Sequence, residues 1–240
     1  MHLDPLALAA VHLDLLYERD EARLLFRSRD VSLPTPFLHL TRTTGGNLWL
    51  LSAALLEQER SELVEALSQE PVIGDLNDME DRPPVLRGVR ALLAAKSARL
   101  MDYRGPVFTF PDPLPLTTGN GEILQEPHKA LTVPELAWIR EATPALHPLS
   151  VTRNAMGEIV AVCHSARSTA TAVAAGVETA PDYRGRGLAG DVVLCWAAAV
   201  RAEDRLPMYG TEWTNHASRA VARKLGLVLW GEDCYFFQPQ

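Results

Sequence analysis

The stretch from Ala174 to Val200, AAGVETAPDYRGRGLAGDVVLCWAAAV, constrains this chain more than any other segment. It reads as a buried strand, a tight turn rich in glycine and arginine (residues 184–190, hereafter the glycine loop), and an amphipathic helix. Gly185 and Gly187 let the backbone approach an anion without a Cβ in the way, and the helix points its unpaired N–H groups at the same place. Arg184 and Arg186 add positive charge. The segment therefore predicts binding of a phosphorylated cofactor.

The glycine loop fits the dinucleotide-binding fingerprint G-x-G-x-x-G when it is read from Gly185 to Gly190. That fingerprint requires a parallel βαβ unit and an acidic residue about 20 residues further on, at the end of the next strand. The strands before the loop resemble antiparallel hairpin strands, and Glu203 and Asp204 fall at a helix end. Glu212 lies near the required distance, so a dinucleotide-binding enzyme is kept as the less favoured alternative.

A second frame fits the loop better. Residues 184–189, RGRGLA, have the form R/Q-x-x-G-x-G/A, and Pro181 precedes them. Downstream, Pro207–Trp213 reads as a strand, and residues 215–227, NHASRAVARKLGL, read as a helix with an asparagine cap that ends in Leu-Gly-Leu. In this order and at this separation, the two motifs resemble the acetyl-CoA loop and the following helix of the GNAT superfamily of N-acetyltransferases. The resemblance covers roughly residues 148–238.

The resemblance implies an α/β fold of the α+β type, the GNAT fold, in which helices flank a mostly antiparallel central sheet. A hairpin signal at Asn154–Gly157 agrees with this expectation. We therefore expect a GNAT acetyltransferase domain over residues 106–240. Residues 1–105 are expected to form a mainly helical extension, because Leu48–Ser68 has apolar residues at helical spacing and a second helix is expected near Val85–Leu100. This extension is either a family-specific addition or a degenerate GNAT-like half.

The resemblance also implies an enzyme that moves an acetyl group from acetyl-CoA to a primary amine by direct attack. The backbone of Val177 and Thr179 would pair with the pantetheine arm, and an N–H such as that of Val177 would polarise the thioester carbonyl. Asn215 would contact the same arm. The residues expected at the cofactor phosphates are Arg184, Gly185, Arg186, Gly187, Leu188, Ala189 and Gly190.

Such a reaction needs a base, because an alkyl amine has a pKa near 10 and only about one molecule in a thousand is neutral at pH 7. Glu178 is the favoured candidate, since it lies beside the glycine loop on a strand face that otherwise holds only small residues. Glu212, at the end of the next strand, is the second candidate. His164 is expected to be a core histidine and His216 a surface residue.

The chain departs from the family at two positions. A glutamate that some members carry on the strand before the asparagine-capped helix would fall at Gly210. Many GNAT enzymes carry a tyrosine in the helix after the asparagine cap, where it acts as general acid for the departing thiolate, and the matching residue here is Ala222. A thiol pKa near 8.5 makes the thiolate a tolerable leaving group. Tyr209 and Tyr235 are the candidates to replace the missing acid. The gap also supports an alternative, a non-catalytic acetyl-CoA-binding sensor or partner module.

The composition of the chain limits its expected partners, its location and its use of metals. The chain has 240 residues, 47% of them hydrophobic, which is enough for a substantial core, and its net charge of −7 argues against binding to nucleic acid or a membrane surface. The three cysteines are far apart and no metal-ligand spacing occurs, so we expect free thiols, a cytoplasmic location and no metal. The expected partner is a small-molecule or peptide amine that no motif identifies, and a homodimer is compatible with the sequence.

Overall fold

The computed structural model describes residues 4–20, 24–30, 33–76, 79, 83–97, 99–116 and 119–239. They fall into two units. The first unit comprises Met1–Phe108, Gly210–Asn215 and Leu229–Gln240, and the second comprises Thr109–Tyr209 and His216–Val228. The C-terminal part of the chain thus contributes to both units.

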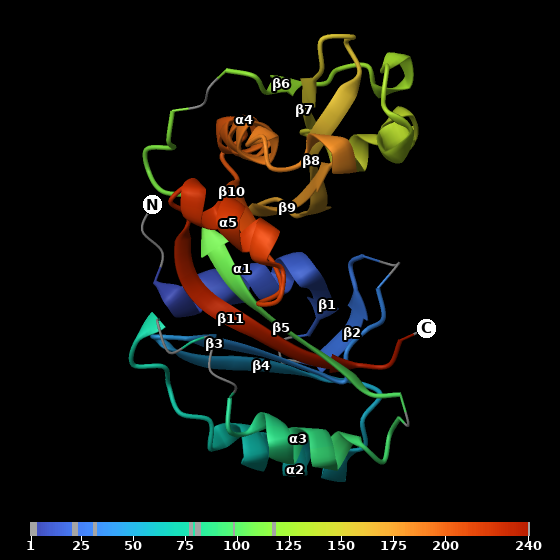
Figure 1. Ribbon diagram of the computed structural model, residues 1–240. Coiled ribbons are helices and arrows are strands. Elements are labelled where there is room, and N and C mark those ends of the chain that lie inside the picture. Colours follow the sequence, from blue (N-terminus) through green and yellow to red (C-terminus); the bar gives the residue numbers. More distant parts are fainter. Residues whose placement is uncertain are drawn as a thin grey trace. The chain divides into compact units, whose positions relative to one another are not determined.

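The first unit is built on a sheet with the strand order β1-β2-β4-β3-β11-β5 (Figure 1). Neighbouring strands run antiparallel in the pairs β1–β2, β4–β3 and β3–β11, and β2 runs parallel to β4. The strands are β1 (Tyr17–Arg19), β2 (Leu24–Ser28), β3 (Leu38–Thr43), β4 (Gly46–Ser52), β5 (Met101–Thr109) and β11 (Val228–Phe237).

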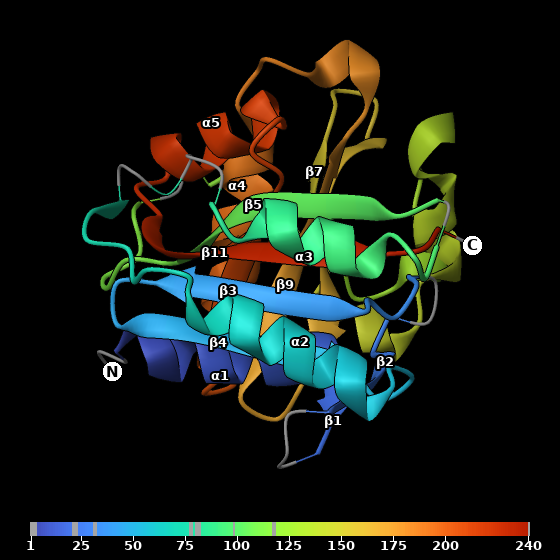
Figure 2. The same ribbon diagram turned by 90° about the horizontal axis from the view of Figure 1, so that it is seen from below.

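Helices cover both faces of this sheet. Helix α1 (Pro5–Leu16) packs on one face, and α2 (Glu57–Ser68) and α3 (Leu86–Leu93) pack on the other, as Figure 2 shows from below. Asp4 caps α1 by accepting hydrogen bonds from the N–H groups of Leu6 and Ala7, both at 3.0 Å. Every residue of β3 is buried as a result, so this strand shows no alternation between buried and exposed positions.

The expectation of a mainly helical N-terminal region is therefore wrong: the region is rich in strands. The segment expected to be one helix over Leu48–Ser68 contains most of β4 up to Ser52, and α2 begins only at Glu57. The second expected helix is shorter than Val85–Leu100 and corresponds to α3. Apolar residues that lie on both faces of a doubly covered strand imitate helical spacing, which is why the pattern misleads here.

A buried cluster of titratable side chains joins α1, β1, β3 and β11 in the first unit. The Asp233 carboxylate lies 2.6 Å from His12 Nε2 and 3.0 Å from His39 Nε2, and it accepts a hydrogen bond from Thr41 Oγ1 at 2.9 Å. The Tyr17 hydroxyl lies 2.7 Å from His39 Nδ1. The two imidazoles and the Thr41 hydroxyl stabilise the negative charge that burial of Asp233 would otherwise disfavour.

A second buried polar cluster surrounds Glu232 on the neighbouring position of β11. Its carboxylate accepts hydrogen bonds from Arg42 Nη1 at 2.7 Å, from Arg104 Nη2 at 2.5 Å and from Trp213 Nε1 at 2.7 Å. Arg42 Nε also lies 3.0 Å from Glu70 Oε1. Burial raises the pKa of Glu70, and the Arg42 charge opposes that rise. The cluster fixes β3, β5 and β11 to one another within the first unit.

The second unit contains a sheet with the order β10-β9-β8-β7-β6. All neighbouring pairs are antiparallel except β10 and β9, which are parallel. The strands are β6 (Glu122–Ile123), β7 (Ser150–Arg153), β8 (Ile159–Ser168), β9 (Ala172–Thr179) and β10 (Leu206–Gly210). The expected mostly antiparallel sheet is thus confirmed.

The helices of this unit also cover both faces of their sheet (Figure 1). Helix α4 (Leu188–Ala202) packs on β7, β8 and β9, with Trp196 Nε1 donating a hydrogen bond to Ser165 Oγ at 3.2 Å. The 3₁₀ segment η3 (Pro134–Glu141) places Leu136 and Ile139 against the opposite face, beside Val160 and Val162. The remaining segments are α5 (His216–Lys224) and the short 3₁₀ turns η2 (Pro127–Lys129), η4 (Pro144–Leu146) and η5 (Pro181–Tyr183).

Candidate active site

The glycine loop connects β9 to α4 through η5. Gly185 and Gly187 have φ values of +76° and +85°, a backbone region that only glycine enters readily, and Gly187 occupies the N-cap position of α4. The first N–H groups of a helix have no carbonyl partner within it. Among the residues that the structure describes, none accepts a hydrogen bond from the N–H groups of Gly185 through Ala189. These donors are therefore available to an anion.

Two arginines of the loop are held by backbone carbonyls. Arg184 Nε donates to the Thr179 carbonyl oxygen at 3.2 Å, and Arg186 Nη2 donates to the Asp182 carbonyl oxygen at 2.7 Å. The Arg186 guanidinium also lies 4.9 Å from the centre of the Tyr183 ring. Both cations thus have defined positions next to the loop while their side chains stay exposed.

Lys224 is a third cation at the glycine loop, and the sequence analysis did not predict it. A Cβ added to Gly187 would lie 3.0 Å from Lys224 Nζ, which extends from the last turn of α5. The helix end is brought here because Leu225 packs against Gly190, where a Cβ would lie 3.4 Å from Leu225 Cδ2. Gly190 thus serves the close packing of α4, and Lys224 completes a set of three positive charges around the loop. The one feature of the sequence that could have indicated this role is the position of Lys224 directly before Leu225-Gly226.

One edge of β9 is open where the strand approaches the loop. In residues 119–239, β10 pairs with β9 only from Leu206↔Ala172 to Met208↔Ala174, whereas β9 continues to Thr179. The Ala180 N–H bonds to Val160 of β8, and the Thr171 carbonyl accepts from Leu206 on the other side. Because backbone groups alternate along a strand, those of Val177 and Thr179 point toward the open edge.

The Glu178 side chain lies on the face of β9 that η3 covers, next to the rings of Trp138 and His164. Its Oε2 accepts a hydrogen bond from Trp138 Nε1 at 3.3 Å, and the Trp138 ring meets the His164 ring edge-on, with centroids 5.2 Å apart. On this face of β9, which otherwise holds only small residues, the His164 ring occupies the space above Gly176. A Cβ at Gly176 would lie 2.4 Å from His164 Cε1. Glu178 itself is exposed.

His164 differs from the satisfied core histidine that was expected. Its Nδ1 is buried and has no hydrogen-bond partner among the described residues. Burial lowers the pKa of the imidazole below 6.5, so the ring is neutral at pH 7 and able to accept a proton. The Glu178 face of β9 therefore presents a carboxylate and a neutral imidazole, which Trp138 contacts in common.

Glu212 and Asn215 belong to the first unit rather than to the unit that holds the glycine loop. Glu212 Oε2 accepts a hydrogen bond from Thr214 Oγ1 at 3.1 Å, and the Glu212 carbonyl accepts from the Asn215 N–H, also at 3.1 Å. Helix α5 begins at His216, directly after Asn215, and His216 is exposed as expected. The expected N-cap position of Asn215 is thus consistent with where the helix starts.

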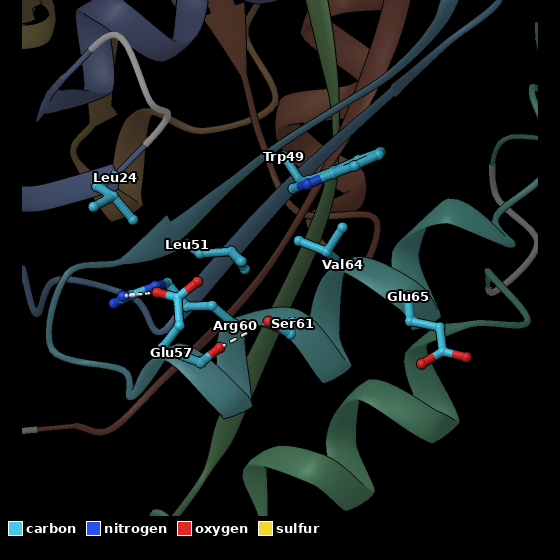
Figure 3. A pocket seen from close by; sticks show the side chains of 8 residues that line it. All are labelled: Leu24, Trp49, Leu51, Glu57, Arg60, Ser61, Val64 and Glu65. Atoms are coloured by element: carbon cyan, nitrogen blue, oxygen red, sulfur yellow. Dashed lines mark hydrogen bonds and ion pairs between the residues drawn. The ribbon is translucent and has the colours of Figure 1, made fainter.

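A pocket in the first unit lies outside this arrangement (Figure 3). It has a volume of about 570 Å³ and an apolar wall of Leu24, Trp49, Leu51 and Val64. Arg60 at its rim donates to the Leu55 carbonyl and to Glu57, each at 2.5 Å. The Arg60 guanidinium is thus bonded to groups of its own segment.

The donor set at the glycine loop suits a phosphate group. It combines exposed N–H groups at a helix N-terminus with three cations, and no Cβ at Gly185 or Gly187 blocks the approach. In the parts of the chain that the structure describes, no group of three or more His, Cys, Asp or Glu side chains is placed to hold a metal ion. No helix in those parts is long and apolar enough to cross a membrane.

Comparison with known proteins supports the resemblance drawn from the two motifs. Residues 150–232 match the sequence model of the GNAT acetyltransferase family. No curated protein matches the sequence significantly. A GNAT-family acetyltransferase structure from Novosphingobium aromaticivorans DSM 12444 is 19% identical, with a TM-score of 0.44, over 58% of this chain and 66% of that one.

Two further solved structures are similar at the same level. A GCN5-related N-acetyltransferase-like protein from Streptococcus suis 89/1591 is 14% identical, with a TM-score of 0.43, over 62% of this chain and 66% of that one. A GNAT-family acetyltransferase from Colwellia psychrerythraea is 16% identical, with a TM-score of 0.47, over 80% of this chain and 76% of that one. The chain spans just under two thirds of the length of the first two structures. The sequence similarity to the GNAT acetyltransferase family thus lies in the C-terminal segment, residues 150–232.

Proposed function

We propose that this protein transfers an acetyl group from acetyl-CoA to a primary amine of a small molecule or peptide. The observation that carries the proposal is the continuity of two features in the second unit. The open edge of β9 presents the backbone groups of Val177 and Thr179, and the strand then runs directly into the glycine loop. A ligand with an extended amide-containing arm and a phosphorylated end matches both features.

In this arrangement the loop and the strand have separate tasks. The loop N–H groups, together with Arg184, Arg186 and Lys224, hold the cofactor phosphates. The backbone groups of Val177 and Thr179 at the edge of β9 pair with the amides of the pantetheine arm as an added strand would, and the Thr179 carbonyl also accepts from Arg184 Nε. The Val177 N–H is aimed at the thioester carbonyl, where it stabilises the negative charge that develops on oxygen during attack.

We further propose that Glu178 takes the proton from the attacking amine, directly or through a water molecule. The carboxylate is exposed and oriented by Trp138, so it can reach a bound acceptor. Glu212 is the second candidate for this role. A base of this kind typically accelerates a reaction by about 10²–10⁴-fold.

Substitution of Glu178 by Gln should lower kcat by about 100-fold at neutral pH, the lower end of the range for a general base. The dissociation constant of acetyl-CoA should stay within about twofold, because Glu178 lies on the face of β9 opposite the Val177 side chain. Steady-state kinetics across pH separate the two effects. Glu122→Gln, at an exposed carboxylate bonded to Arg153 in the same unit, is the control. A Glu178→Gln enzyme with wild-type kcat would remove Glu178 from the role of base.

The proposal is tested by measuring CoA release from acetyl-CoA with a panel of primary amines. Turnover with at least one amine supports the acetyltransferase. Acetyl-CoA binding without turnover of any amine would instead favour a binding module, an alternative that rests on Ala222 at the position of the usual tyrosine. The dinucleotide alternative retains one supporting feature, because β9, α4 and β10 do form a parallel βαβ unit. Competition between NAD and a CoA probe distinguishes it.

A further inference from the structure

We propose that His164 recognises the acceptor, so that the enzyme selects a primary amine that carries a hydrogen-bond-accepting oxygen a few bonds from its nitrogen. The inference rests on the proposed acetyl transfer and names a substrate class for the same site. The amine lies at Glu178, the proposed base, and the oxygen lies at the His164 imidazole. The backbone alone places Glu178 beside the position assigned to the thioester, because it lies between Val177 and Thr179 on β9.

The register of β8 and β9 brings the imidazole and the carboxylate to one face of the sheet. His164 is the cross-strand partner of Gly176, and Glu178 is the partner of Val162, two residues away on each strand. Such diagonal neighbours lie roughly 7–8 Å apart. Trp138 of η3 contacts both side chains: its Nε1 donates to Glu178 Oε2 at 3.3 Å, and its ring centroid lies 5.2 Å from that of His164. One small molecule can therefore reach both polar groups.

Gly176 leaves the space that the His164 ring occupies. A Cβ at Gly176 would lie 2.4 Å from His164 Cε1 and 2.5 Å from Nε2, so a larger residue would displace the ring. His164 is only partly buried, and Glu178 is exposed. The glycine thus allows an imidazole to lie on β9 next to an accessible carboxylate, and all of these residues belong to the second unit.

The hydrogen bonding of the His164 ring decides what it can offer to a ligand. Among the described residues, neither ring nitrogen has a hydrogen-bond partner, and Nδ1 is buried. A buried N–H without an acceptor is rarer in proteins than a buried acceptor without a donor, so the single proton of the neutral ring belongs on Nε2. Burial lowers the pKa of His164, which keeps the ring uncharged at neutral pH. The imidazole therefore offers one Nε2–H donor.

A donor next to a carboxylate selects a ligand with two different polar groups. The Glu178 carboxylate accepts hydrogen bonds from the amine N–H groups. The Nε2–H of His164 needs an acceptor, which the amine nitrogen cannot supply while its lone pair attacks the thioester. A hydroxyl or carbonyl oxygen on the same molecule supplies it, whereas a plain alkylamine would cover the N–H and leave it unpaired. The uncharged ring does not repel the cationic form of the amine.

The test compares acceptors that differ in one group. Isobutylamine has a methyl group where 1-amino-2-propanol has its hydroxyl, and 2-methylallylamine and glycinamide form the corresponding pair for a carbonyl oxygen. His164→Phe keeps a ring above Gly176 but has no N–H. It should lower kcat/KM for the oxygen-bearing amine of a pair by about 3–10-fold, mainly through KM, and leave the value for its partner within about twofold.

Two further variants separate recognition from packing. His164→Gln provides an amide N–H donor and should recover at least about half of the preference that His164→Phe loses. His128→Phe, at an exposed histidine of η2 in the same unit, should leave the values for all four amines unchanged. Equal losses for both amines of each pair in His164→Phe would overturn the inference, because the ring would then have only a structural role.

Nitrogen-15 NMR of the histidine rings tests the tautomer without catalysis. The chain has seven histidines, and the His164 signals are those missing from the spectrum of His164→Phe. In the protein with CoA, the proton should lie on Nε2, and 1-amino-2-propanol should shift the Nε2 signal while isobutylamine does not. A proton on Nδ1 would overturn the inference and leave the proposed acetyl transfer standing. Failure of every amine to react would refute the proposed function itself, and the inference with it.

Discussion

Replacing Gly187 with Val should weaken acetyl-CoA binding by about 100-fold or more. The new side chain would require a left-handed backbone at φ +85°, and its Cβ would lie 3.0 Å from Lys224 Nζ. It would therefore displace a cation and crowd the N–H groups of the loop. Hydrogen bonds to charged groups contribute about 1.5–3 kcal/mol each, so the loss of one or two accounts for this factor. Titration calorimetry with acetyl-CoA gives the affinity.

The matched control for this variant is Gly157→Val. Gly157 belongs to the same unit and has φ +81°, but a Cβ there has no atom within 4 Å. Both variants should lose similar stability, about 1–2 kcal/mol, from the strained backbone. Only Gly187→Val should lose affinity. If the two variants bind acetyl-CoA equally well, the glycine loop is not the phosphate site.

Substituting Asp233 by Ala should lower the free energy of unfolding by about 3–5 kcal/mol, the usual cost of removing one partner of a buried ion pair. Asp233 is 4% exposed and lies within 3.0 Å of both His12 and His39, which would lose their anionic neighbour. Denaturant unfolding gives the value. Asp14→Ala, which breaks an exposed ion pair with Arg19 in the same unit, should cost no more than about 1 kcal/mol. Equal losses for the two variants would contradict the assigned role.

The contribution of Asp233 to the free energy of unfolding should decrease as the pH falls. Burial alone would raise the pKa of its carboxyl, but His12 and His39 outweigh that effect and hold the pKa far below the ordinary 3.8. A depressed pKa means that the stabilisation is complete above the unfolded value and is lost as the pH falls below it. The stability difference between the wild type and Asp233→Asn should therefore shrink as the pH decreases below 3.8. A difference that stays constant down to acid unfolding would be the contrary result.

Local signals in the second unit were sufficient to predict the turn between β7 and β8, the start of α4 and the end of α5. The turn between β7 and β8 is set by Asn154, whose Oδ1 accepts from the N–H groups of Met156 and Glu158, and by Gly157 at positive φ. The start of α4 after two positive-φ glycines and the end of α5 before Gly226 follow equally from residues close in sequence. In such segments the deciding interactions are short-range, so the sequence pattern is informative.

Long-range interactions explain what the sequence did not reveal. Strand β3 pairs with β11 from Leu38↔Phe236 to Thr43↔Gly231, so its partner lies near the other end of the chain. Neither the strand-rich N-terminal region nor the buried Glu232 cluster has a local signature. The same holds for the candidate site. Lys224 reaches the glycine loop through the packing of α5, and the same packing brings Ser218 Oγ to 2.5 Å from the hydroxyl of Tyr209, a candidate for the missing acid.

The most direct test of the central claim is thermal stability in separate titrations with acetyl-CoA, CoA and NAD. A ligand that binds only the native protein adds about 2.7 kcal/mol at 100 times its Kd, which is readily seen as a rise in melting temperature. We predict that acetyl-CoA and CoA raise the melting temperature of the wild-type protein, that NAD does not, and that Gly187→Val loses the response. A rise with NAD alone, or no rise with either CoA species, would contradict the assignment of the glycine loop to acetyl-CoA.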